Sequence, residues 1–181
     1  MLLWFLFANG WQLLAAVLLA AAVHEGGHYL VLRLLGAEVI AVRISVFGAE
    51  MQVRGRLSYG GDLAATLAGP GANLLSGCLL AAMGGPWLVF AGAHLVLGCF
   101  NLLPIRPLDG GRALAAAVRW TAGPDAGEWA ARWIGGAAAA ALAAGVFFLM
   151  WRSGGSLWLL PAAIGLIAAS AGEVRGKRSF L

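Results

Sequence analysis

The chain has 181 residues, of which 61% are hydrophobic and only 11% carry a charge. Soluble domains have roughly 25% charged residues, so this composition excludes a water-soluble globular protein and predicts an integral membrane protein. The net charge of +4 does not indicate a nucleic-acid partner, because no basic stripe is interleaved with aromatic residues. We predict an all-α polytopic fold with about five to six transmembrane helices and one small membrane-associated β-hairpin.

The first membrane-crossing helix is expected over residues 11–35. The apolar residues 2–7 are too short to span a bilayer, and Asn9-Gly10 separates them from the longer run that begins at Trp11. That run is long enough to cross the hydrocarbon core, and Gly36 follows its end. Toward that end it contains the sequence His24-Glu25-Gly26-Gly27-His28.

This stretch has the spacing of a metal site. Two histidines four residues apart lie on one helix face, separated by roughly 6 Å of rise and about 40° of rotation. Both imidazoles could then bind one metal ion, with Glu25 beside them to take a proton from the attacking water. Ionisable groups in a span cost about 2.5 kcal/mol or more when uncompensated, and a bound cation would compensate them. The alternative is a polar patch that lines a cavity.

Residues 38–61 change to the alternating pattern of strands, as in Val39 to Ser45, and predict a β-hairpin. One face of it is too polar to lie unpaired in lipid. It could be a structural cap at the membrane surface, or an exposed edge that holds a substrate backbone in extended form.

The remaining helices follow in order. Asp62 is expected to cap a helix that runs to about Met83, and the glycines and proline at 84–86 turn the chain into a helix over residues 87–103. A proline-broken segment then leads to a short helix over residues 112–120. Two further spans are expected over 128–151 and 157–172, followed by a basic tail.

A third metal ligand is expected at Asp109. A catalytic zinc ion commonly has three protein ligands, and Asp109 follows a segment with two prolines, where irregular backbone can line a water-filled cavity. Gly110 and Gly111 would remove side chains that crowd the metal. Asp109 could instead be the N-cap of the following helix.

Three other polar side chains lie in apolar helices. Asn73 could form an interhelical hydrogen bond, or donate to a substrate carbonyl or its developing oxyanion. His94 is interpreted as structural. The Asn101 side chain is expected to form a hydrogen bond with a backbone group in the segment before Pro104.

Orientation follows from the basic residues. If the helix over 11–35 ends in the cytoplasm, eleven of the twelve lysine and arginine residues lie on that side and only Arg152 lies outside. This predicts a multi-pass cell-membrane protein with its metal site toward the cytoplasm and a cytoplasmic C-terminus.

The ordered motifs resemble those of the site-2 proteases, a family of intramembrane zinc metalloproteases. They are the HEGGH sequence, Ala68-Gly69-Pro70-x-x-Asn73, and NLLPIRPLDGG ending in Asp109-Gly-Gly. The last is most similar to the stage IV sporulation protein FB type, which releases a membrane-tethered pro-sigma factor. The resemblance implies one Zn²⁺ per chain bound by His24, His28 and Asp109, with Glu25 as general base and Asn73 as a substrate-positioning residue.

By this resemblance residues 1–181 form a single protease domain, with its catalytic core at 11–121 and a C-terminal helix pair and basic tail at 128–181. The expected partners are a membrane-tethered protein substrate, the lipid bilayer and membrane proteins that inhibit or regulate it. Control by a nucleotide-sensing or PDZ domain is not expected. The alternatives are a metal-ion transporter, which would spread its ligands through the membrane, and an inactive scaffold, which would not need Glu25.

Overall fold

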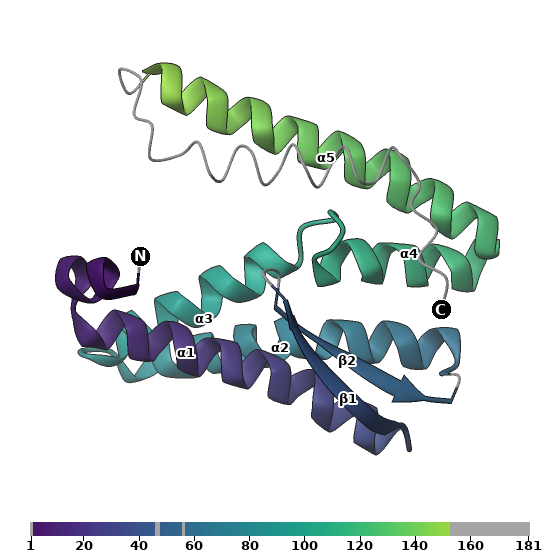
Figure 1. Cartoon of the computed structure of the whole chain (residues 1–181), viewed down its shortest axis with the longest axis horizontal. Helices are drawn as coiled ribbons and strands as arrows, with labels where there is room; N and C mark the ends of the chain where they lie inside the picture. The colour runs from purple at the N-terminus through teal and green to yellow at the C-terminus, as the bar shows by residue number, and fades with distance from the viewer. Residues whose placement is uncertain (1, 46–47, 56, 153–181) are drawn as a thin grey trace. The chain divides into compact units, whose positions relative to one another are not determined.

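The computed structural model describes residues 2–45, 48–55 and 57–152, and these form five helices and one two-stranded antiparallel sheet (Figure 1). The predicted helical fold with a single β-hairpin is confirmed. The chain forms two compact units, residues 1–102 and residues 103–181. The predicted span over 157–172 and the basic tail lie outside the described residues.

Helix α1 (Leu2–Leu34) is interrupted at Gly10, where φ is 75° and ψ is 161°. Glycine adopts this conformation readily because it has no Cβ, so two helical segments meet at the predicted break. The segment from Gly10 to Leu34 has 25 residues. At 1.5 Å per residue it is about 37 Å long, enough to cross a hydrocarbon core of about 30 Å.

The hairpin consists of β1 (Glu38–Ser45) and β2 (Gly48–Arg54). The register pairs Val39 with Val53 and Ala41 with Gln52, so Ile40 is the extra residue of a β-bulge. Ile40 is exposed. The opposite side of the hairpin packs on α1 and α2, in a cluster made of Val31, Leu32, Ala37, Val39, Met51, Val53, Leu57 and Ala65.

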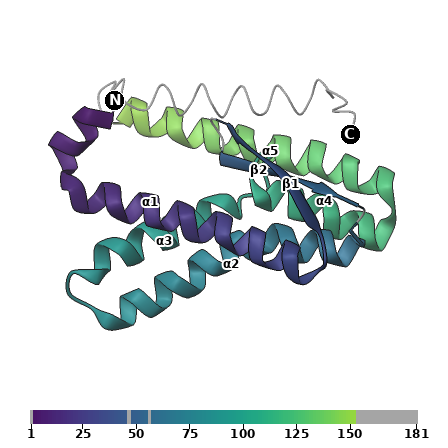
Figure 2. The same cartoon turned by 60° about the horizontal axis from the view of Figure 1, so that its bottom comes forward.

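Helix α2 (Tyr59–Met83) and helix α3 (Trp87–Asn101) are joined by a turn that contains Gly84 and Gly85, both with positive φ. The two helices run back along each other, and both pack against α1 (Figure 2). The expectation that Asp62 caps α2 is wrong. The helix begins three residues earlier, and the Ser58 hydroxyl accepts a hydrogen bond from the Gly61 amide at 3.1 Å. Asp62 lies in the first turn.

Glycine residues, which have no side chain, allow helices α1, α2 and α3 to approach closely. A Cβ on Gly27 of α1 would lie 2.6 Å from the carbonyl oxygen of Ala68 in α2. A Cβ on Gly98 of α3 would lie 3.2 Å from the Cβ of Asn73, also in α2. Small residues at such contacts are typical of helices packed in membranes, where backbones approach without a hydrophobic driving force.

The second unit contains helix α4 (Asp109–Ala122) and helix α5 (Pro124–Arg152). Both are longer than the predicted 112–120 and 128–151. Gly123 alone, with φ of 92°, makes the turn between them, so α4 ends later and α5 begins earlier than expected. A Cβ on Gly127 would lie 2.7 Å from the carbonyl oxygen of Ala115, so α4 and α5 also approach closely. The Arg106 guanidinium forms two hydrogen bonds with the Glu128 carboxylate, at 3.0 and 3.1 Å.

Three helical segments of the described chain are long and apolar enough to cross a membrane: Gly10–Leu34, Tyr59–Met83 and Pro124–Arg152. Helix α3 is apolar but shorter, with 15 residues, or about 22 Å. The predicted total of five to six spans counted α3 and the helix over 157–172. The protein is thus a membrane protein with several apolar helices.

Candidate metal centre

His24 and His28 occupy the same face of α1, as their spacing predicted. The Nε2 atoms of the two rings lie 3.2 Å apart. The rings meet edge to face, with centroids 4.8 Å apart and an interplanar angle of 86°. His24 is buried and His28 is partly buried. The two imidazoles therefore direct the same ring nitrogen at one small region inside the first unit.

The proton position on His28 is set by the backbone of α2. His28 Nδ1 lies 2.8 Å from the carbonyl oxygen of Ala65. Because a carbonyl oxygen can only accept, Nδ1 carries the hydrogen, and Nε2 is the nitrogen whose lone pair can bind a metal. A Cβ on Gly69 would collide with the His28 ring, so Gly69 of the Ala-Gly-Pro motif makes the space in which this ring lies.

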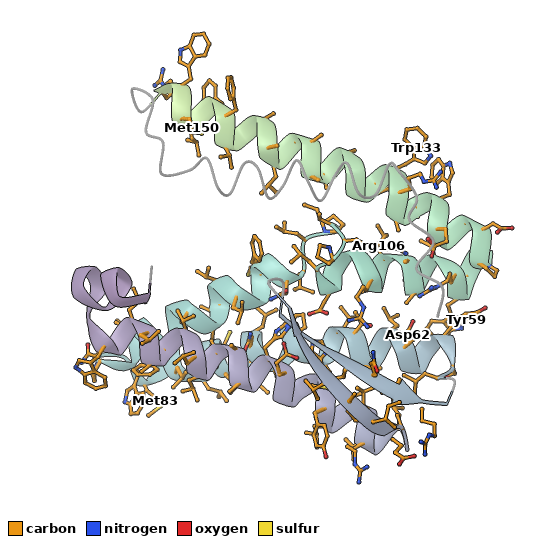
Figure 3. All side chains as sticks on the ribbon, in the orientation of Figure 1. Tyr59, Asp62, Met83, Arg106, Trp133 and Met150 are labelled. Carbon is orange, nitrogen blue, oxygen red and sulfur yellow. The ribbon has the colours of Figure 1, made fainter. Side chains whose placement is uncertain are left out.

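His24 is held by Asn73. The Asn73 amide nitrogen lies 3.3 Å from His24 Nδ1, and the Asn73 amide oxygen lies 3.2 Å from Nδ1 of His94. Asn73 and His94 are 0% and 1% exposed. These hydrogen bonds connect α1, α2 and α3 through their interior. Figure 3 labels Tyr59 and Met83 at the two ends of α2, and Asn73 lies between them along the helix.

The two histidines fit a divalent zinc ion. Nitrogen ligands bound at about 2.0–2.1 Å with tetrahedral angles are about 3.3–3.4 Å apart, close to the 3.2 Å between the Nε2 atoms. Each Nδ1 already contacts a protein group, Ala65 or Asn73. Metal-binding histidines typically use their other ring nitrogen in this way, which orients the ring. Only the Nε2 atoms are thus directed at a cation.

Glu25 is half-buried on α1 beside these histidines. Its Oε2 atom has less than 1 Å² of accessible surface. A carboxylate beside the two histidines is placed where a group that accepts a proton during a reaction would be needed.

Asp109 lies in the second unit, as the first residue of α4. The alternative that it is an N-cap is wrong. The N-cap is Leu108, which makes no side-chain hydrogen bond to the helix. Asp109 is 7% exposed, and its Oδ1 lies 3.8 Å from the Arg112 guanidinium. Its carboxylate oxygens are also of a kind that zinc accepts as ligands.

Gly111 lies against the backbone of the preceding segment. A Cβ there would lie 2.6 Å from the Arg106 nitrogen and from the carbonyl carbon of Ile105. Because glycine has no side chain, this backbone can approach closely, and the role of Gly110 and Gly111 beside a metal stays a prediction.

Within the first unit the structure brings together His24, His28 and Asn73, and it adds His94. Sequence reasoning missed the contact of His94 with Asn73. The available signal was that both are polar residues inside apolar helices, so each needed a partner. Asn101, by contrast, donates to the carbonyl of Leu97 in its own helix at 3.1 Å, as expected of a residue that satisfies backbone.

The fold is that of a site-2 protease. The chain is similar to the site-2 protease from Methanocaldococcus jannaschii, with a TM-score of 0.68 and 21% sequence identity over 96% of this chain and 82% of that chain. It is also 37% identical over 127 residues to a protein named "Putative zinc metalloprotease Rip3" in two strains of Mycobacterium tuberculosis. That similarity covers 62% of this chain and 32% of the relatives, so the chain matches about a third of their length. No protein-family model matches the sequence.

Proposed function

We propose that this chain is a zinc-dependent intramembrane endopeptidase of the site-2 protease family. The observation that carries the proposal is the pair of Nε2 atoms of His24 and His28, 3.2 Å apart on a helix that is long and apolar enough to cross a membrane. The likeness in fold to one site-2 protease and in sequence to Rip3 supports it.

Zinc would be bound by His24, His28 and Asp109. Each offers one ligand atom of a kind that zinc accepts, a ring nitrogen or a carboxylate oxygen. Asp109 is buried and is not used as a helix cap. It follows the last residue of α3 by eight residues in the sequence.

Zinc supplies Lewis-acid activation of water and of the scissile carbonyl when it is bound. Glu25 accepts the proton of the attacking water and delivers it to the leaving amine. Protein donors would stabilise the developing oxyanion, and Asn73 is proposed as a substrate-positioning residue.

The substrate is a protein tethered to or embedded in the membrane. Its backbone must be extended for cleavage, because a helix hides its carbonyls in hydrogen bonds. The hairpin is a candidate to hold it, since each strand has a single partner in the described sheet and the outer residues Ile40 and Val42 are exposed and apolar. From the distribution of the basic residues we propose that the site faces the cytoplasm. From the NLLPIRPLDGG motif we propose that the substrate is a pro-sigma factor that is processed in sporulation.

The test is Glu25→Gln, with metal content measured in the same sample. Cleavage of a single-span membrane substrate in proteoliposomes should fall by at least about 10³-fold while zinc content stays near that of the wild type, because the variant removes the base and no proposed ligand. Glu128→Gln removes a carboxylate in the exposed ion pair of the second unit and should cleave normally. Normal cleavage by zinc-loaded Glu25→Gln would contradict the mechanism.

The ligand set is tested by Asp109→Ala. Zinc content measured after dialysis against a weak chelator should fall well below one per chain, and unchanged content would remove Asp109 from the site. Zinc flux across proteoliposomes by the wild type, without cleavage of any substrate, would favour the transporter alternative.

A further inference from the structure

Helix α5 of the second unit has tryptophan and arginine residues at both of its ends. Trp129, Arg132 and Trp133 lie near its start, and Trp151 and Arg152 are its last two residues. Residues 134–150 carry no charge. At 1.5 Å per residue, Trp151 lies about 33 Å along the axis from Trp129 and about 27 Å from Trp133. These distances bracket a hydrocarbon core of about 30 Å, so Arg132 lies at the depth of the lipid headgroups when α5 spans a bilayer.

The side chains at this depth point outward from the second unit. Trp129 and Trp133 are 62% and 61% exposed, and Arg132 is also exposed, whereas Ala130 and Ala131 between them are buried. Figure 3 shows the Trp133 side chain on the side of α5 that faces away from α4. Tryptophan is enriched where hydrocarbon meets headgroups, because its ring is largely apolar and its N–H donates a hydrogen bond. An exposed arginine between two such residues is therefore placed to contact headgroups.

Positive charge exceeds negative charge around this part of α5. Glu128 accepts two hydrogen bonds from the Arg106 guanidinium, at 3.0 and 3.1 Å, and lies 3.9 Å from the Arg119 guanidinium. Arg132 lies one helical turn after Glu128, and it forms no ion pair with a carboxylate of the described residues. Even with Asp125 of the first turn included, the arginines outnumber the carboxylates. An anion at headgroup depth would balance this excess.

We propose that Arg132 binds the phosphate of an anionic phospholipid, with Trp129 and Trp133 beside the headgroup. Arg106 and Arg119 contribute their positive charge while they stay in contact with Glu128. Arginine suits this role because its planar guanidinium presents several donors to phosphate oxygens. The proposed orientation places this end of α5 at the cytoplasmic face, where anionic lipids attract basic residues. The proposal does not depend on the zinc site.

The surface that continues along α5 favours a lipid over a free anion. Phe147 lies five helical turns after Trp129, and so on the same face, and it is 64% exposed. Between them on this face, Ala140 and Ala144 are exposed, and a Cβ on Gly136 would meet nothing within 4 Å. Acyl chains joined to the phosphate would cover this apolar surface, which is favourable in proportion to the area they remove from contact with water. Inorganic phosphate could not do so.

The test measures headgroup preference with the full chain in mixed vesicles. Brominated phosphatidylglycerol and brominated phosphatidylcholine with the same acyl chains both quench tryptophan fluorescence, so competition between each of them and unlabelled lipid gives their relative affinity. At low salt we expect phosphatidylglycerol to bind at least about fivefold more tightly, the effect of one basic residue at an anionic surface. Added salt should reduce the preference.

Three variants locate the site. Arg132→Gln should bring the preference for phosphatidylglycerol close to one. Arg152→Gln is the matched control, because it removes an exposed arginine beside a tryptophan at the other end of the same helix, and it should leave the preference unchanged. Glu128→Gln removes a carboxylate from the site and should raise the preference by a few fold. A general loss of structure would not move Arg132→Gln and Glu128→Gln in opposite directions.

Four outcomes would overturn the proposal. They are equal affinity of the wild type for the two lipids, an equal decrease in Arg132→Gln and Arg152→Gln, displacement of phosphatidylglycerol by inorganic phosphate, and formation of a disulfide-linked dimer by Trp133→Cys in vesicles. The third would show a site for a free anion, and the fourth would show that a second copy covers this surface. Because no cleavage is measured, the result is separate from that for the proposed protease activity.

Discussion

A set of hydrogen bonds in the first unit and an ion pair in the second unit differ in how deeply they are buried. In the first, His24, Asn73 and His94 are at most 6% exposed and are joined by neutral hydrogen bonds of 3.2 and 3.3 Å. In the second, Arg106 and Glu128 form a two-pronged ion pair at 3.0 and 3.1 Å, with side chains 36% and 59% exposed. The shorter contacts between full charges are the weaker ones energetically, because water solvates and screens exposed charges. Burial, more than charge or distance, therefore determines how strong each of these contacts is.

The largest effect is expected from filling the space beside the buried histidine. In Gly69→Ala the new methyl group collides with the His28 ring and should turn the ring away from the carbonyl of Ala65. Zinc affinity should fall at least a hundredfold, about 2.7 kcal/mol. Gly71→Ala, two residues later, meets nothing within 4 Å and should bind zinc as the wild type does. Equal zinc affinity in the two variants would contradict this description of the site.

A smaller effect is expected from separating the helices that carry these residues. Gly27→Ala places a methyl group 2.6 Å from the Ala68 carbonyl oxygen, so α1 and α2 must move apart. The free energy of unfolding in detergent should fall by about 1–3 kcal/mol, as for overpacked cores. The neighbouring Gly26→Ala has open space and is the control. If it destabilises the protein as much, the close approach at Gly27 does not matter.

The cap of α2 should contribute about 1 kcal/mol. Ser58→Ala removes the hydroxyl that accepts from the Gly61 amide, and loss of such caps typically costs 0.5–2 kcal/mol. Thr121→Ala is a suitable comparison, since that exposed hydroxyl donates to carbonyls of its own helix, at Ala117 and Val118. Thermal unfolding of both variants should show the larger decrease in Tm for Ser58→Ala.

The smallest effect is expected from the exposed ion pair. A double-mutant cycle with Arg106→Gln and Glu128→Gln should give a coupling energy below about 1 kcal/mol, reduced further by added salt. Chemical denaturation of the four proteins measures it. A coupling as large as the effect of Gly69→Ala would reverse the comparison between the two units.

Much of the fold was predictable from local patterns. The apolar run after Gly10, the alternation at 38–54 and the glycines at 84–85 placed the second segment of α1, the hairpin and the α2–α3 turn within a few residues. The predicted starts of helices were wrong where a single capping residue sets the first turn. Ser58, and not Asp62, caps α2, and α4 begins at Asp109 because Leu108 is its N-cap.

The candidate site was predictable in part. The four-residue spacing of His24 and His28 on a helix dictates that they share a face, whatever surrounds them. The roles of Glu25, Asn73 and Asp109 stay predictions. Nothing in the spacing of Asn73 and His94, 21 residues apart on different helices, indicated that they would meet.

The sequence by itself thus determined a membrane protein with a pair of histidines on one apolar helix, because composition and helical periodicity act through near neighbours alone. Only the tertiary structure decided which nitrogen of each histidine is available. That depends on the carbonyl of Ala65 for His28 and on the amide of Asn73 for His24. Both groups come from α2, which reaches these rings through close contacts at Gly27 and Gly69. A hydrogen bond between helices depends on distances that packing sets, and packing involves residues far apart in the chain.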